Sequence, residues 1–221
     1  VSQHFRNHSI GKLIKGFIVH LDRSQFEVWA LTPSQYNDEI GSEIQKHADH
    51  FILISESSLP IARQQIAQCY LDILIYTDIG MDPLTYFLAF ARLAPLQCTY
   101  WGHGSTTGIP TIDYFISWKA YFEDWFHPEL KRSLDYYAET LLLMNSLPTF
   151  YTPPRLPQQW RSREEFGLEK GISLYVCTQS LFKFLPEFDE LLGAILKEDP
   201  YGQIILLEGS YSQWTTLLKQ R

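Results

Sequence analysis

Apolar and polar residues alternate along this 221-residue chain in short blocks whose spacing switches between that of helices and that of strands. The apolar run at 72–76 predicts a strand that is covered on both faces, and a second run at 96–101 predicts the strand that follows it. Between these runs, apolar residues recur at i, i+3, i+4 and i+7, the spacing of one buried helical face: Leu84, Phe87, Leu88 and Ala91. Asp82 precedes this helix as an N-cap, and Pro95 ends it.

The same two patterns extend through most of the chain. Further strands are predicted over 26–31, 51–55, 114–117, 141–144, 174–177 and 204–207, and further helices over 9–21, 38–47, 61–68 and 186–197. Ser9 is the predicted N-cap of the first helix, and a helical excursion is expected within 118–137. Because strands and helices alternate, the fold class is α/β with mainly parallel sheets.

A proline-rich stretch divides the chain. Four prolines fall within 147–157, a composition typical of an extended crossover. We therefore predict a first domain over 1–146, a linker over 147–171 and a second domain over 172–221. The second domain has only about 50 residues, so we interpret it as incomplete and the chain, which begins without methionine, as a fragment.

Composition and charge exclude several classes of protein. The chain has 18 Lys and Arg against 25 Asp and Glu, a formal net charge of −7, and no basic run that could follow a nucleic-acid backbone. No apolar run reaches the roughly 20 residues of a membrane span, and no signal peptide opens the sequence. We expect a cytoplasmic protein without nucleic-acid or membrane partners. Cys69, Cys98 and Cys177 are predicted to be buried free thiols.

His8 is the first residue that could carry chemistry. It lies at the start of a predicted helix, where an imidazole can orient a hydroxyl or take its proton. The alternative is a histidine that only caps the helix or faces solvent. His4 lies four residues earlier, but no third ligand accompanies the two, and we expect no metal site there.

Two loops offer further candidates. Lys183 lies between the strand at 174–177 and the helix at 186–197, where a cation and free backbone amides can hold a phosphate; the alternative is a solvated lysine. The loop 102–108 offers glycine amides and threonine hydroxyls to a sugar or phosphate, or it is a plain turn. Asp78 and Asp82 lack the DxD spacing of metal-dependent sugar transferases, so no metal is expected at this pair either.

Several short motifs occur in one order along the chain. They are HFRNHS at 4–9, DIGMDP at 78–83, LAPLQ at 93–97, WGH and TTG at 101–103 and 106–108, and QSLFK at 179–183. Together they resemble the catalytic region of O-linked N-acetylglucosamine transferases and their bacterial relatives associated with tetratricopeptide repeats. The resemblance covers nearly the whole chain.

This resemblance implies a GT-B-like fold of two Rossmann-like units, the second incomplete. It implies metal- and cofactor-independent, inverting transfer of a sugar, N-acetylglucosamine in the family, from a UDP-sugar to protein Ser or Thr hydroxyls. Tetratricopeptide repeats can precede such a region in a longer chain. Two alternatives stay open. The enzyme could transfer the sugar to asparagine, or the chain could be a non-catalytic binding or scaffold module with the same fold. The second alternative also fits a fragment that is inactive by itself.

The resemblance also assigns site residues. His8 and Lys183 are the catalytic candidates, one at the acceptor and the other at the diphosphate. The residues expected to bind substrate or donor are Gly102, His103, Thr106, Thr107, Gln179 and Ser180. Some relatives carry a glutamine three residues before the lysine, so either Gln179 or Ser180 occupies the matching place.

Overall fold

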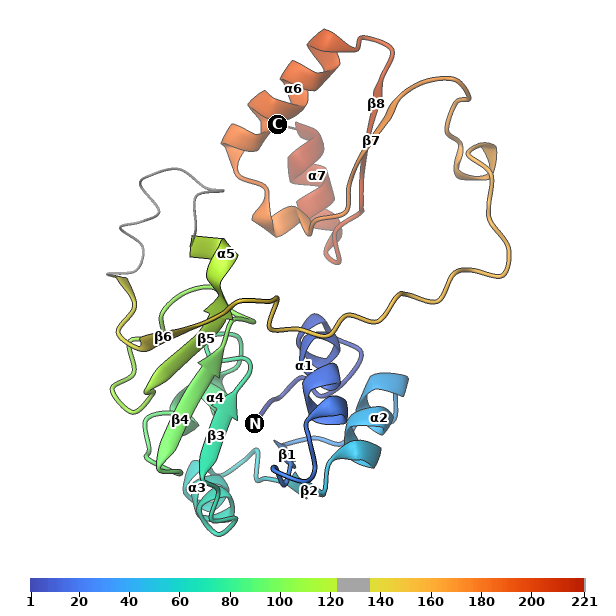
Figure 1. Cartoon of the computed structure of the whole chain (residues 1–221). Coiled ribbons are helices and arrows are strands. Elements are labelled where there is room, and N and C mark those ends of the chain that lie inside the picture. Colours follow the sequence, from blue (N-terminus) through green and yellow to red (C-terminus); the bar gives the residue numbers. More distant parts are fainter. Residues whose placement is uncertain (123–135, 221) are drawn as a thin grey trace. The chain divides into compact units, whose positions relative to one another are not determined.

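The computed structural model describes residues 1–122 and 136–220, which form two compact units, Val1–Pro153 and Pro154–Arg221 (Figure 1). The helical excursion expected within 118–137 is described only in its first part, as helix α5 at Lys119–Phe122. The rest of that prediction, 123–135, lies outside the described residues. Each unit is described below by itself.

The first unit alternates strands with helices. In chain order its described elements are α1 (Ser9–His20), β1 (Trp29–Thr32), α2 (Glu39–His47), β2 (His50–Leu53), α3 (Leu59–Ala67), β3 (Ile73–Tyr76), α4 (Pro83–Leu88), β4 (Leu96–Tyr100), β5 (Tyr114–Trp118), α5 and β6 (Thr140–Met144). All pairings between these strands are parallel, with β1 beside β2 and with β3, β4, β5 and β6 in sequential order. The predicted α/β class with parallel sheets is confirmed.

The first residues of the chain join the two groups of strands. The Ser2 amide donates to Leu31 O at 3.1 Å, the Val1 amino group donates to Ile75 O at 2.7 Å, and the Thr77 amide donates to Val1 O at 3.3 Å. Residues 1 and 2 therefore lie between β1 and β3 and satisfy backbone groups of both. This placement brings the segment that leads into α1 to the ends of the central strands.

Helices cover both faces of these strands (Figure 1). Helices α3 and α4 pack on a buried cluster that includes Leu31, Leu74 and Tyr76, whereas α1 and α2 pack on a second cluster that includes Ala30. Neighbouring residues such as Ala30 and Leu31 belong to opposite clusters because successive side chains of a strand point to opposite faces. Burial on both faces explains why the strands read as continuous apolar runs.

The structure corrects three local predictions. The N-cap of α1 is His8 rather than Ser9, because the His8 side chain accepts the hydrogen bond from the Ile10 amide. Helix α4 ends at Leu88 instead of continuing through Ala91. Phe87 is 53% exposed, although its spacing predicted burial. In the short α4 the buried positions are Thr85 and Leu88, so the prediction is confirmed for Leu88 and is wrong for Phe87.

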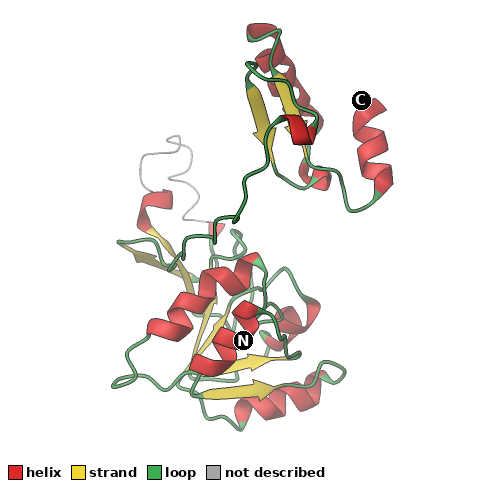
Figure 2. Ribbon diagram, turned by 90° about the vertical axis from the view of Figure 1, so that its right-hand side faces the viewer, coloured by secondary structure: helices red, strands yellow, loops and turns green. Residues whose placement is uncertain are grey.

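The second unit holds the elements η2 (Glu164–Phe166), β7 (Leu174–Cys177), η3 (Leu181–Lys183), α6 (Pro186–Glu198), β8 (Gln203–Leu206) and α7 (Ser212–Gln220). Strands β7 and β8 form a parallel pair, visible side by side in Figure 2. Helix α6 connects them, as a parallel pair requires. Among the described residues of this unit, the buried hydrophobic side chains are Leu181 and Phe184, at the two ends of η3.

Candidate active site

The carboxyl ends of β3 and β4 meet the beginning of α1. A Cβ atom on Gly102 would lie 2.5 Å from Ile10 Cδ1 and 2.6 Å from Thr77 O, so only glycine allows this close approach. A Cβ on Gly80 would lie 3.4 Å from His103 Nδ1, which places His103 beside the loop after β3. The structure thus brings the helix capped by His8 and the loop at 102–103 to one edge of a parallel sheet, where α/β proteins bind ligands.

His8 is held by its own helix. Its backbone is extended, with φ −136° and ψ 158°, and its Nδ1 atom accepts the Ile10 N–H at 3.2 Å. The side chain is partly buried. Burial, followed by the nearby charges of His4, Arg6 and Lys12, lowers the pKa of His8 below its usual value of 6.5. His8 is therefore neutral at pH 7.

His4 stacks on His8. The ring centroids lie 4.1 Å apart and the planes differ by 19°. The His4 amide donates to Ser2 Oγ at 2.9 Å, and this hydroxyl in turn donates to Asp78 Oδ2 at 2.9 Å. Asp78 Oδ2 also accepts the Gln3 amide at 2.8 Å. A carboxylate at the end of β3 therefore fixes the segment that carries both histidines.

Asp78 is fully buried, and this burial raises the pKa of its carboxyl group. The hydrogen bonds from Gln3 and Ser2 lower the pKa, but their effect is smaller than that of burial. Among the described residues, the second oxygen of Asp78, Oδ1, has no hydrogen-bond partner. In the same part of the chain, Gln3 Oε1 and His4 Nδ1 also have none. Buried polar atoms normally have partners, so this edge holds hydrogen-bonding capacity for water or a ligand.

The segment before α1 is also fixed on its other side. The Asn7 amide donates to Asp38 Oδ2 at 2.9 Å, while Asp38 Oδ1 caps α2 by accepting the Gly41 amide at 2.9 Å. One carboxylate therefore starts α2 and holds the residue that precedes His8. Asp38 and Asp78, from two different loops, together set the path of the chain into the site.

The loop 102–108 is anchored by a residue that the sequence did not reveal. Glu139, 5% exposed, accepts the Thr106 hydroxyl at 2.7 Å and the Thr107 amide at 2.8 Å, and it also accepts the Thr107 hydroxyl. Burial alone would raise the pKa of Glu139, but the hydrogen bonds from Thr107 and Thr106 lower it below its usual value. Both threonine hydroxyls are thus engaged within this unit, while Gly104 is exposed.

A cavity of about 340 Å³ lies beside this loop. Its lining joins the loop to aromatic side chains from two other segments: Gly104, Ser105, Thr106, Tyr121, Phe122, Tyr136 and Tyr137. The Tyr137 hydroxyl donates to Gly104 O at 2.7 Å and so connects the two sides. An aromatic wall beside a polar loop suits the apolar face and hydroxyl edge of a sugar.

The remaining predicted site residues belong to the second unit. Lys183 closes η3 and is exposed, with its ammonium group 5.8 Å from the centre of the Phe182 ring. Burial of Leu181 and Phe184 fixes this turn, so Phe182 and Lys183 face solvent just before α6 begins. Gln179 folds back on its own loop, because its Oε1 accepts the Ser180 amide at 2.9 Å.

The two aspartates of the 78–83 motif have separate structural roles. Asp82 caps α4 as predicted: its Oδ1 accepts the Leu84 amide at 2.9 Å and the Thr85 amide at 3.2 Å. Within residues 1–122 and 136–220, no three His, Cys, Asp or Glu side chains gather as a set that could hold a metal ion. In the same part of the chain, no helix has the length and apolar character to cross a membrane.

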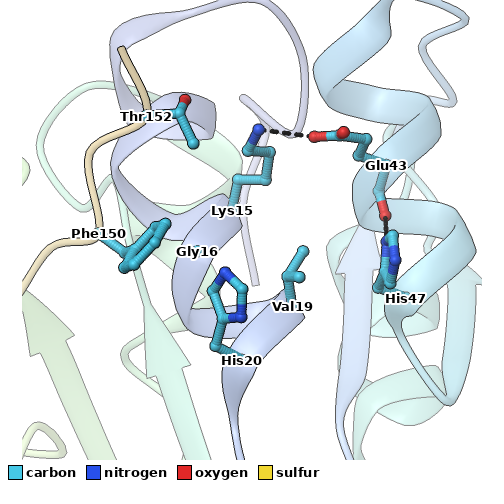
Figure 3. A pocket seen from close by; sticks show the side chains of 8 residues that line it. All are labelled: Lys15, Gly16, Val19, His20, Glu43, His47, Phe150 and Thr152. Carbon is cyan, nitrogen blue, oxygen red and sulfur yellow. Dashed lines mark hydrogen bonds and ion pairs between the residues drawn. The ribbon is translucent and has the colours of Figure 1, made fainter.

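A second cavity, of about 170 Å³, lies at the far end of α1 (Figure 3). The Lys15–Glu43 ion pair, at 2.6 Å, borders it, and the Phe150 ring packs against His20 in a tilted arrangement, with ring centroids 4.5 Å apart and planes at 55°. Gly16 lets Phe150 approach α1, because a Cβ there would collide with the Phe150 side chain. This cavity serves mainly to seat the chain after β6 on α1, and none of the predicted site residues lines it.

Comparisons with known proteins place this arrangement in context. No family model matches the chain. A curated relative from Arabidopsis thaliana, named "Probable UDP-N-acetylglucosamine--peptide N-acetylglucosaminyltransferase SEC", is 27% identical over 218 residues, which cover 94% of this chain and 21% of that protein. The chain is homologous to this relative. It spans about a fifth of the length of this curated relative.

A comparison by structure agrees with the fold described above. A mutant O-GlcNAc transferase of Thermobaculum terrenum matches it with a TM-score of 0.82 and 20% identity, over 99% of this chain and 40% of the other. This match confirms the predicted GT-B-like fold class. The resemblance read from the five motif segments is confirmed by the sequence similarity to the Arabidopsis relative. The roles of individual residues stay predictions.

Three residues of this site were not predicted from the sequence: His4, Asp78 and Glu139. The sequence placed His4 and Asp78 in motifs and suggested only a metal site for them, and it suggested no role for Glu139. Asp78 lies directly after an apolar strand, a position that could have suggested an anchor at the sheet edge. Glu139 directly precedes β6, a position at which solvent-exposed carboxylates are also common. The sequence therefore gives no signal that separates this buried anchor from a surface residue.

Proposed function

We propose that this chain is part of a glycosyltransferase that moves N-acetylglucosamine from a UDP-sugar to Ser or Thr hydroxyls of proteins. The observation that carries the proposal is the position of His8. A neutral imidazole caps a helix at the carboxyl edge of a parallel sheet, among buried polar atoms that have no partner within the described residues. Homology to proteins named for this reaction supports the choice of donor and acceptor.

In this proposal, His8 orients the acceptor hydroxyl and Lys183 binds the diphosphate of the donor. A fixed cation near the leaving group stabilises the negative charge that develops there as the sugar departs. Lys183 suits this role because η3 exposes it on a turn anchored by two buried side chains. His103, beside Gly80, and the exposed Gly104 would contact substrate near His8.

Sugar transfer by the full-length gene product tests the proposal. UDP-N-acetylglucosamine and a Ser/Thr-rich protein are the substrates, and mass spectrometry detects the product. We expect Lys183→Ala to reduce kcat by about 10² to 10³, the typical effect of removing one group that stabilises transition-state charge. Lys197→Ala, at the other end of α6, is the matched control and should leave the rate unchanged. Equal rates for Lys183→Ala and the wild type would remove Lys183 from the mechanism.

Two further measurements separate the alternatives. Alkaline β-elimination releases sugars from Ser and Thr but not from Asn, so a resistant product would show transfer to asparagine. Calorimetric titration of UDP reports donor binding directly, and Lys183→Ala should weaken it. A full-length protein that neither binds UDP nor transfers sugar would be a binding or scaffold module with this fold.

A further inference from the structure

The hydrogen bond at the N-cap of α1 decides which nitrogen of His8 carries the proton. Nδ1 accepts the Ile10 N–H at 3.2 Å, and an imidazole nitrogen can accept only through its lone pair, when it is unprotonated. A neutral imidazole has one ring proton, which must then lie on Nε2. The cap therefore specifies the Nε2–H tautomer.

We infer that His8 acts in the proposed transfer as a hydrogen-bond donor through Nε2–H, and that it does not accept the proton of the acceptor hydroxyl. This inference rests on the proposed function and assigns the chemical role of one residue in it. Nδ1, the nitrogen with a free lone pair in this tautomer, is already occupied by Ile10. In the proposed transfer, Nε2–H donates to an oxygen lone pair of the bound substrate, on the hydroxyl, the sugar or the diphosphate.

The surroundings of His8 keep it neutral. Three basic side chains lie near it: His4, whose ring stacks on it, Arg6 in the preceding loop, and Lys12 in the first turns of α1. A proton added to His8 would be repelled by these groups and would also occupy Nδ1, which would break the cap. Two carboxylates hold this segment, and both accept backbone amides: Asp78 is hydrogen-bonded to Ser2 and Gln3, and Asp38 to Asn7 and Gly41.

NMR spectroscopy of this chain, labelled with ¹⁵N-histidine, tests the tautomer without any assay of activity. A long-range ¹H–¹⁵N correlation spectrum distinguishes protonated from unprotonated ring nitrogens, and His8→Asn identifies the His8 signals by their loss. At pH 7.5 we expect Nδ1 to be unprotonated and Nε2 to be protonated. A protonated Nδ1 would overturn the inference. His4→Phe, which keeps an aromatic ring against His8 and removes the charge, should raise the pKa of His8 without changing its tautomer.

Two variants of the full-length protein test the donor role. In His8→Asn, the side-chain oxygen can replace Nδ1 as the helix cap, but no donor lies at the position of Nε2. In His8→Gln, the longer side chain places an amide donor near that position, and the helix cap is lost. Neither side chain can act as a base. We therefore expect His8→Gln to retain about tenfold more kcat than His8→Asn, although His8→Asn is the more stable protein. Equal losses of kcat in a stable His8→Asn and a folded His8→Gln would contradict the donor role.

These outcomes separate the inference from the proposed function. A full-length protein without sugar transfer, but with protonated Nε2 in this chain, would leave the tautomer established and the transferase proposal wrong. Sugar transfer together with a protonated Nδ1 would leave the transferase intact and show that His8 can serve as its base. The apparent KM for each substrate in His8→Gln shows which one receives the hydrogen bond, since only that substrate's KM should change.

Discussion

At the scale of single residues, Glu139 holds the loop between β4 and β5 in place. Its carboxylate accepts hydrogen bonds from the hydroxyls of Thr106 and Thr107 and from the Thr107 amide. Removing this carboxylate would leave buried donors without a partner, which costs about 1 to 3 kcal/mol. We expect Glu139→Ala to lower the free energy of unfolding of the first unit by this amount, measured by urea denaturation.

The same residue predicts a dependence of stability on pH. The pKa of Glu139 in the folded chain is below its usual value of 4.5, so the unfolded chain binds more protons at acid pH. Its stabilising contribution is complete above about pH 4.5 and is lost as the pH falls through the lower folded-state value. Glu139→Gln should reduce the slope of stability against pH in this range, whereas Glu56→Gln, at an exposed position, should not.

At the scale of elements, the first turn of α1 packs directly on backbone. A Cβ on Gly11 would collide with the carbonyl oxygen of Arg6 and would lie 2.7 Å from that of His4. The loop that carries the two histidines can follow its observed path only because residue 11 has no side chain. The element that presents His8 therefore depends on a glycine three residues after it.

This packing predicts opposite effects of two Gly→Ala substitutions in helices. Gly11→Ala should lower the free energy of unfolding by about 1 to 3 kcal/mol, since overpacking outweighs the gain in helix propensity. Gly193→Ala, in α6, meets no atom within 4 Å and should stabilise its unit by about 0.5 to 1 kcal/mol. Thermal unfolding followed by circular dichroism measures both, and a stabilised Gly11→Ala protein would contradict the packing described for α1.

At the scale of the whole molecule, the chain consists of two units whose boundary falls at Pro153 and Pro154. The residues that follow this boundary, 154–165, are all exposed and carry no helix or strand before η2. Exposed backbone without such structure is the preferred substrate of proteases.

Limited proteolysis tests this division. Trypsin should cleave first after Arg161 or Arg163, and the product containing residues 1–153 should persist. Arg63, which lies in α3 and donates to Phe87 O at 2.8 Å, is the internal comparison and should be cleaved much later. Cleavage at Arg63 before the 154–165 segment would show that the first unit is not compact.

The sequence by itself determined the order of elements, the parallel α/β class and the resemblance to O-GlcNAc transferases. These features follow from local patterns: apolar runs for strands buried on both faces, and side chains such as Asp38 and Asp82 that cap the helix directly after them. Even here the prediction had limits at the ends of elements. Phe87 was assigned to a buried face because α4 was predicted to be longer than its 6 residues.

Only the tertiary structure decided how the site is held together. Ser2 and Asp78 are 76 residues apart in the sequence, and Thr107 and Glu139 are 32 residues apart, yet each pair forms a hydrogen bond. These contacts depend on which strand ends lie side by side, and no local pattern encodes that information. The His4–His8 stack and the cap formed by His8 Nδ1 likewise depend on the path that the two carboxylates, Asp78 and Asp38, impose on the segment before α1.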